Sequence, residues 1–253
     1  QLYVANGVVN KRQARMILAD EVGLGKTIEA ALVFAELKAR GLVKRALIIV
    51  PASLQVQWQT ELSNKFNEEF TIIDANSVGH FSRGSTNPFQ AVDLAICSLA
   101  FATRTKRREQ IVEADWDFLV FDEAHRVRRY RRGKGATATK AYELAEELEP
   151  LTPAILMLTA TPMQLHPFEL YSLLQVVEPG LFRSWEQYER QRTQVPRVND
   201  LIRKINAWAQ QPDPEKAQAL ELAASLLGPE EVGQRTLEAP NGRQEVIDRV
   251  VEL

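Results

Sequence analysis

Residues 16–27 read Met16-Ile17-Leu18-Ala19-Asp20-Glu21-Val22-Gly23-Leu24-Gly25-Lys26-Thr27, and this stretch decides the fold. The first four residues form an apolar run typical of a buried strand, and apolar residues at helical spacing start directly after Thr27. Gly23 and Gly25 allow backbone N–H groups to turn toward phosphates at the positive end of that helix. The order of strand, glycine loop and helix therefore predicts a phosphate-binding loop.

The end of this loop predicts the ligands ATP and Mg²⁺. Lys26 would reach the β- and γ-phosphates, and the Thr27 hydroxyl would take a position on the Mg²⁺ ion. Asp20 stands where the general phosphate-loop pattern has its first glycine. An ordinary glycine-containing turn before a helix therefore stays as the alternative.

Short apolar runs recur along the first two thirds of the chain and predict the fold class. They are too short for helices, and stretches with helical spacing lie between several of them. After the run that starts at Met16, the runs are Ala46–Val50, Phe70–Ile73, Leu94–Cys97, Phe118–Phe121 and Ala154–Leu158. This pattern predicts an α/β fold with a mainly parallel sheet flanked by helices, which binds its ligands at the carboxyl ends of the strands.

The pattern changes after Glu178, where Pro179-Gly180 is followed by polar helical stretches without a convincing strand. We therefore predict two parts, a nucleotide-binding domain over residues 1–178 and a helical extension over residues 179–253.

Bulk composition narrows the class of protein without naming a partner. The 253 residues are 45% hydrophobic and 25% charged with a net charge of -2, so any basic surface must be local. The single Cys97 lies in an apolar run and is expected in the core of a protein from a reducing compartment. No apolar run is long enough to cross a bilayer and the first residues do not resemble a signal peptide, so we predict a cytoplasmic protein without a membrane partner.

Two carboxylates follow the apolar run Phe118–Phe121 directly, in the order Asp122-Glu123-Ala124-His125. At the carboxyl end of a buried strand, Asp122 would hold the Mg²⁺ and Glu123 would orient and deprotonate the attacking water. The alternative is that the acids only begin a helix, where they suit its dipole.

Thr159-Ala160-Thr161-Pro162 follows the last apolar run. The two hydroxyls, with His125, would link the carboxylates to a neighbouring element and so report the nucleotide state, whereas the alternative is a simple turn closed by Pro162.

Taken together, the ordered motifs resemble those of superfamily 2 helicase-like ATPases and, more narrowly, of the Swi/Snf family. The matching segments are residues 20–27, Val50–Leu54 with Gln57-Trp58, Ile96–Leu99, Asp122–His125 and Leu158–Pro162. They are similar to motifs I, Ia, Ib, II and III of that family and span roughly residues 1–165. The aspartate at position 20 is a feature of the family's motif I. The residues of several motifs look most like those of the bacterial branch typified by the RNA-polymerase-associated ATPase.

The resemblance implies a RecA-like lobe, the first of two that close on ATP, with the arginines that complete the site supplied by the second. Nothing after Pro162 resembles second-lobe motifs, so we expect the extension to lead toward a second lobe that this chain lacks. Gln1-Leu2-Tyr3 resembles the tail of the family's adenine-reading segment upstream of motif I, which implies that Gln1 would hydrogen-bond the adenine base. The residues expected to bind nucleotide are then Gln1, Asp20, Glu21, Val22, Gly23, Leu24, Gly25, Lys26 and Thr27.

Nucleic-acid contacts are expected from three places. By resemblance, Ser53 and its neighbours contact the backbone of one tracked strand, while Trp58 is by default a core residue. Two arginine-rich stretches could bind phosphates or could simply be solvated. They are the loop after the acidic pair, with Arg126, Arg128, Arg129, Arg131, Arg132 and Lys134, and the cluster of Arg104, Lys106, Arg107 and Arg108.

The function that we expect is an ATP hydrolase that moves on double-stranded DNA, or on RNA, and remodels a bound complex such as RNA polymerase. Lys26, Asp122 and Glu123 would be its catalytic residues. Two alternatives stay open: a nucleotide-binding interaction module without turnover, and the motor of a restriction or phage-defence system.

Overall fold

The computed structural model describes residues 14–19, 25–81, 87–132, 135–160, 166–210, 212–228, 232–239 and 241–251. It divides into two compact units, of which the first extends to Leu181 and the second runs from Phe182 to Leu253. Each unit has a hydrophobic core of its own. We predicted the change in character at Glu178.

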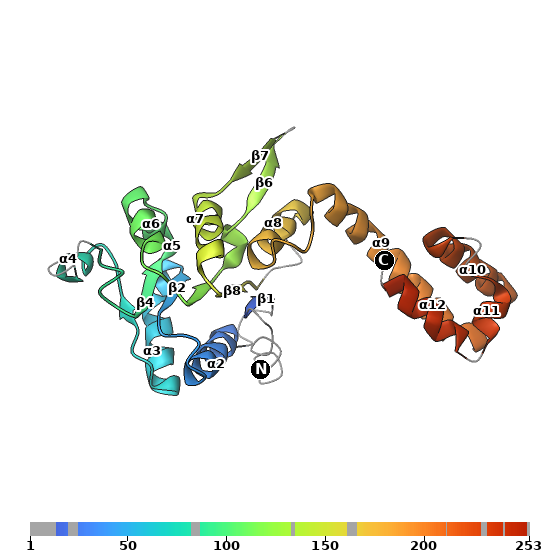
Figure 1. The fold of residues 1–253 in the computed structure, drawn as a ribbon, viewed down its shortest axis with the longest axis horizontal. Helices are drawn as coiled ribbons and strands as arrows, with labels where there is room; N and C mark the ends of the chain where they lie inside the picture. The colour runs from blue at the N-terminus through green and yellow to red at the C-terminus, as the bar shows by residue number, and fades with distance from the viewer. Residues whose placement is uncertain are drawn as a thin grey trace. The chain divides into compact units, whose positions relative to one another are not determined.

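Unit 1 is built on a six-stranded sheet in the order β1-β8-β5-β2-β4-β3, and every pair in it is parallel (Figure 1). The strands are β1 Arg15–Leu18, β2 Ala46–Val50, β3 Thr71–Ile72, β4 Leu94–Ser98, β5 Phe118–Phe121 and β8 Ala154–Leu158. The predicted α/β class with a mainly parallel sheet is confirmed, since each strand lies on one of the six apolar runs.

Helices cover both faces of this sheet (Figure 1). They are α2 Lys26–Ala39, α3 Gln55–Phe66, α4 Val78–Phe81, α5 Leu99–Ala102, α6 Thr105–Val112, α7 Lys140–Leu148 and α8 Pro167–Val177, with short 3-10 turns at Ala52–Leu54, Ala124–Arg126 and Glu149–Leu151. Helices α2 and α3 pack with Ala46, Ile48 and Val50 of β2. Helices α5 to α8 pack with Leu47 and Ile49. Successive residues of a strand face opposite sides, so runs that are apolar throughout build two cores at once.

Gly41 follows the carboxyl end of α2. Its φ of 71° places it in the left-handed region, which glycine enters without steric cost, and its N–H donates to the carbonyl of Lys38. The thiol of Cys97 is fully buried, and burial raises its pKa. Cys97 is therefore a core residue, as its apolar surroundings in the sequence predicted.

One part of the fold contradicts the sequence prediction. The arginine-rich stretch after the acidic pair, which we expected to be a loop, forms the antiparallel hairpin β6 Arg129–Arg132 with β7 Gly135–Ala138 (Figure 1). The pattern of apolar runs does not predict this strand, because its arginines are charged. In the structure, the Arg129 guanidinium lies over the rings of Tyr142 and Phe168, and the Arg131 guanidinium lies over the ring of Phe168. An arginine that stacks on an aromatic ring can occupy a position that looks solvated in the sequence.

Unit 2 is helical in the part of it that the structure describes. Its helices are α9 Trp185–Asn206, α10 Asp213–Leu227, α11 Gln234–Glu238 and α12 Gly242–Val251, with a 3-10 turn at Trp208–Gln210. Leu201, Ile205, Ala219, Ala223 and Val246 form the centre of its core. No helix among the described residues of either unit combines the length and the apolar character needed to cross a membrane.

Candidate functional site

The strands that carry the predicted motifs are neighbours in the sheet. Strand β8 pairs with β1 on one side and with β5 on the other, and all three run in the same direction. Their carboxyl ends therefore open on one edge, where the phosphate loop follows β1, the acidic pair follows β5 and Thr159 follows β8. The backbone N–H of Thr159 donates to the carbonyl of Leu18 (3.0 Å), which ties the ends of β8 and β1 together.

The described part of the phosphate loop is its carboxyl end. Gly25 has φ 90° and ψ 29° and directly precedes α2, and among the residues that the structure describes no side chain caps this helix. The left-handed conformation favours glycine, and an uncapped helix N-terminus offers backbone N–H groups to an anion. Lys26 and Thr27 open the helix and are half-buried. Several residues predicted for the site lie outside the described residues: Gln1, Asp20, Glu21, Val22, Gly23, Leu24 and Thr161.

Asp122 is held from two directions. Its backbone N–H donates to the carbonyl of Ile49 on β2 (2.9 Å). Its Oδ1 accepts the backbone N–H of Glu123 (2.8 Å), and its Oδ2 accepts the indole Nε1–H of Trp58 (2.9 Å). Burial raises the pKa of this carboxyl, although both hydrogen bonds and the positive charge of Lys26 act in the opposite direction. The charge of Lys26 therefore acts on the carboxyl of Asp122.

Glu123 adopts a backbone conformation that few residues other than glycine adopt, with φ 52° and ψ 47°. Such strain is found often at functional positions. Its Oε2 lies 3.0 Å from Nδ1 of His125, a distance at which a protonated imidazole pairs with a carboxylate, and both side chains are about one third exposed. Glu123 is therefore accessible from solvent and has an imidazole within reach.

The predicted contacts to nucleic acid differ in their availability. Ser53 is exposed in the 3-10 turn after β2, and Arg126 is exposed after the acidic pair. In contrast, Arg128 pairs with Glu169 (3.0 Å), and the backbone N–H of Arg129 donates to Ser172 Oγ (3.0 Å) while its guanidinium lies over two aromatic rings. These two arginines hold the hairpin against α7 and α8.

The second arginine cluster also has partners within the fold. Arg104 and Arg107 lie over the ring of Phe101, and Arg107 donates to Gln110 (2.7 Å). Arg108 pairs with Glu143 (2.5 Å) and Glu147 (2.7 Å) on α7. Much of the charge that suggested a phosphate-binding surface is thus neutralised or stacked within unit 1.

Sequence reasoning missed the contact between Trp58 and Asp122. Trp58 is a core residue, as expected, with 2% of its surface exposed, but its indole N–H reaches the carboxylate that follows β5. The sequence carried no signal for this contact, because it depends on β2, which precedes the helix that contains Trp58, lying beside β5 in the folded sheet.

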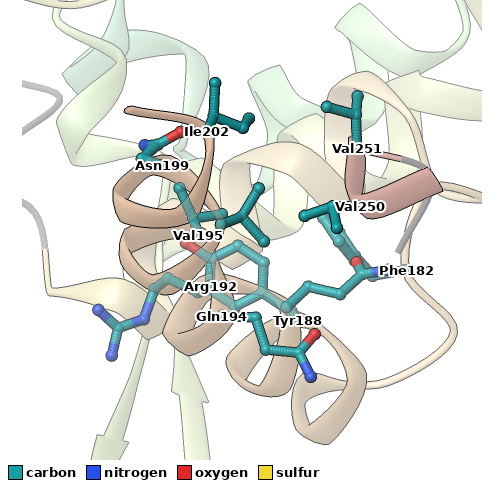
Figure 2. Close-up of a pocket in the computed structure, with 11 residues that line it drawn as sticks. Phe182, Tyr188, Arg192, Gln194, Val195, Asn199, Ile202, Val250 and Val251 are labelled. Carbon is teal, nitrogen blue, oxygen red and sulfur yellow. The ribbon is translucent and has the colours of Figure 1, made fainter. Parts of the chain in front are cut away.

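Unit 2 contains a separate groove of about 550 Å³ between α9 and α12 (Figure 2). Its apolar lining includes Phe182, Tyr188, Val195, Ile202 and Val250. The guanidinium of Arg192 extends away from these side chains in Figure 2 and pairs with Glu189 (2.9 Å). The lining of the groove is therefore mainly apolar.

Comparison with protein families places these observations in context. Residues 6–222 match the sequence model of one protein family, which is described as the SNF2-related domain. Among curated proteins, the RNA polymerase-associated protein RapA of Pectobacterium carotovorum subsp. carotovorum is 38% identical over 235 residues, which are 92% of this chain and 23% of that protein. The RapA of Vibrio parahaemolyticus is 34% identical over 258 residues, covering 100% of this chain and 26% of the relative. The chain thus spans about a quarter of the length of these relatives.

Solved structures give the same fold. The SWI2/SNF2 ATPase core of Sulfolobus solfataricus in complex with dsDNA has a TM-score of 0.55 at 17% identity, and the match covers 94% of this chain and 60% of that one. The Sulfolobus solfataricus SWI2/SNF2 ATPase core domain has a TM-score of 0.51 at 26% identity, and the match covers 69% of this chain and 33% of that one. The similarity confirms the expected RecA-like lobe.

Proposed function

Because this chain belongs to the SNF2-related domain family, we propose that it is the ATP-binding lobe of a DNA-dependent ATPase that moves on double-stranded DNA. The observation that carries the proposal is the shared edge of β1, β8 and β5, where the charge of Lys26 acts on the carboxyl of Asp122. A lysine after β1 and an acidic residue after β5, on the two sides of β8, suit a nucleoside triphosphate.

Each residue at this edge has a proposed part in hydrolysis. Lys26 and the N–H groups at the start of α2 bind the phosphates, and Glu123 orients the attacking water and takes its proton. His125 lies within reach of Glu123 and, with Thr159 and Thr161, couples the site to nucleic acid.

The described residues fit a Mg²⁺ ion that arrives with the nucleotide. Among them, no group of three or more His, Cys, Asp or Glu side chains forms a protein-only metal cage. Mg²⁺ is held in such sites by one or two protein groups together with substrate phosphates, and Thr27 and Asp122 would be those groups here. When bound, the ion would neutralise charge that develops on the phosphates.

The partners follow from the relatives. The Sulfolobus solfataricus ATPase core was solved with dsDNA, and the RapA proteins are named as RNA polymerase-associated. We propose dsDNA as the track and a bound protein complex, such as RNA polymerase, as the target that is remodelled. The chain spans about a quarter of the relatives' length, so turnover and movement are proposed for the whole protein rather than for this lobe alone.

Binding of a fluorescent ATP analogue to the chain tests the first step of the proposal. Lys26→Ala should weaken this binding at least about tenfold, because it removes the charge that contacts the phosphates. Lys38→Ala is the matched control, since Lys38 lies on the same helix and pairs with Glu68. Equal binding by wild type and Lys26→Ala would contradict the proposed site.

Hydrolysis is tested separately, by adding duplex DNA, single-stranded DNA or RNA to the full-length protein and measuring phosphate release. Stimulation by duplex DNA supports the motor. Nucleotide binding without hydrolysis under any of these conditions would instead support an interaction module without turnover.

A further inference from the structure

The hydrogen bond between Trp58 and Asp122 points to a second function for a residue that otherwise belongs to the core. We propose that Trp58 is a positioning residue that fixes the Asp122 carboxylate for Mg²⁺ and nucleotide. This inference rests on the proposed function, because it concerns the same site.

Strand geometry explains why the two side chains meet. Phe118 and Val120 of β5 belong to the core on the side of α2 and α3. Side chains alternate along a strand, so position 122 continues on that side of the sheet. Helix α3 presents Gln55, Trp58 and Leu62 as its buried residues, and the Trp58 indole Nε1–H reaches Asp122 Oδ2 at 2.9 Å.

The arrangement fixes the carboxylate and still leaves it able to bind. Asp122 Oδ1 accepts the N–H of Glu123, and Asp122 Oδ2 accepts that of Trp58. Each carboxylate oxygen offers about two lone-pair directions, so each keeps one for a metal ion or for water in its shell. With both oxygens bonded, rotation of the carboxyl group about its bond to the chain is restrained before any ligand arrives.

Trp58 is a rigid donor because the rest of its side chain is packed. It is 2% exposed and lies in the core with Leu62, Val50 and Phe70. The helix α3 starts from the end of β2, and the carbonyl of Ile49 on β2 accepts the backbone N–H of Asp122. Strand β2 thus holds the backbone of Asp122, and the helix α3 that follows it holds the side chain.

Trp116 provides a comparison within the same chain. It is also 2% exposed, but it lies in the core on the opposite face of the sheet, and its indole N–H donates to the backbone carbonyl of Ile111 (3.0 Å). The buried indole N–H of a tryptophan therefore finds an acceptor in this fold without a carboxylate. The bond to Asp122 is the feature that distinguishes Trp58.

The test compares Trp58→Phe with Trp116→Phe, since each removes one buried indole N–H. For each, binding of a non-hydrolysable fluorescent ATP analogue is titrated with Mg²⁺. Trp58→Phe should raise about tenfold the Mg²⁺ concentration at which the increase in analogue binding is half-maximal, because a hydrogen bond to a charged group is lost. Binding of the analogue without Mg²⁺ should not change. Mn²⁺, which binds such ligands more tightly, should reduce the defect. Trp116→Phe should bind with the Mg²⁺ dependence of the wild type.

Two results separate failure of the inference from failure of the proposed function. If Trp58→Phe binds nucleotide with the Mg²⁺ dependence of the wild type, only the positioning role is wrong. If the wild type binds no nucleotide with or without Mg²⁺, the proposed function is wrong and this inference with it.

A measurement on the unmutated chain covers the case in which Trp58→Phe does not fold. In ¹⁵N-labelled protein with assigned indole resonances, addition of Mg²⁺ and the ATP analogue should shift the Trp58 resonance, because its acceptor is then engaged. The Trp116 resonance should stay in place. A Trp58 resonance that does not move at saturating ligand would overturn the proposal.

Discussion

The acidic segment Asp122–His125 and the arginine-rich segment Arg126–Arg132 adjoin in the sequence but differ in how the fold uses their charges. Glu123 and His125 stay about one third exposed, close to each other and open to a ligand. Within the second segment, Arg128 is paired with Glu169 and Arg129 is stacked on Tyr142 and Phe168. The difference teaches that a charge which could bind a ligand can equally be taken up by the fold, and that only its neighbours decide which.

Replacement of the exposed acid should have the largest effect. Glu123→Gln keeps the shape of the side chain and removes the base, so the full-length protein should lose about a thousandfold in hydrolysis rate while its affinity for ATP stays the same. Phosphate release and nucleotide binding are measured on the same preparation. Glu36→Gln, at an exposed position on α2, is the control, and hydrolysis that persists in Glu123→Gln would show that the acidic segment is not the catalytic one.

Replacement of a buried arginine whose donors all have partners should lower the stability of the fold instead. Arg15 is 9% exposed, pairs with Glu149 and donates to the carbonyls of Glu149 (2.7 Å) and Thr152 (2.8 Å). Arg15→Ala should lower the free energy of unfolding by about 3 kcal/mol, because it leaves a carboxylate and three carbonyls, that of Pro153 included, without their donor. Urea denaturation measures the loss. Arg40→Ala, which breaks an exposed pair with Glu36, should cost at most about 0.5 kcal/mol, and equal losses would refute the assignment.

Arg128 should behave as a weaker version of Arg15. Its side chain is 40% exposed, so Arg128→Ala should destabilise the protein by only about 0.5 to 1 kcal/mol. The salt dependence of DNA binding should not change, since this guanidinium already has a carboxylate partner. A reduced salt slope without loss of stability would place Arg128 on the nucleic acid and remove it from the group of structural arginines.

Replacement of Arg126 should have the smallest effect, and unlike replacement of Arg128 it should change DNA binding and not stability. It is exposed, and no hydrogen bond or ion pair of its side chain occurs within the described ranges of the chain. If it contacts a phosphate, Arg126→Ala should reduce the slope of log affinity for duplex DNA against log salt by about 0.9 and leave the unfolding transition in place. An unchanged slope would mean that this arginine is simply solvated.

The strands were predictable because their apolar runs are continuous. Phe118–Phe121 and Ala154–Leu158 are buried on both faces, and a run that faces two cores has no polar positions to obscure it. The hairpin β6–β7 was not predictable in the same way, because Arg129 and Arg131 pack through stacking on rings that come from α7 and α8. The bond from Trp58 to Asp122 was hidden for a similar reason, since it joins residues from separate elements.

The sequence by itself determined the sheet class, the family and the order of the nucleotide motifs, because these depend on local runs and short spacings. The proposed roles of Gln1, residues 20–24 and Thr161 stay predictions from the sequence, because they lie outside the described residues. Only the tertiary structure decided which charges remain available. Availability depends on partners such as Glu169 for Arg128 or Trp58 for Asp122, and the chain brings these together only when it folds.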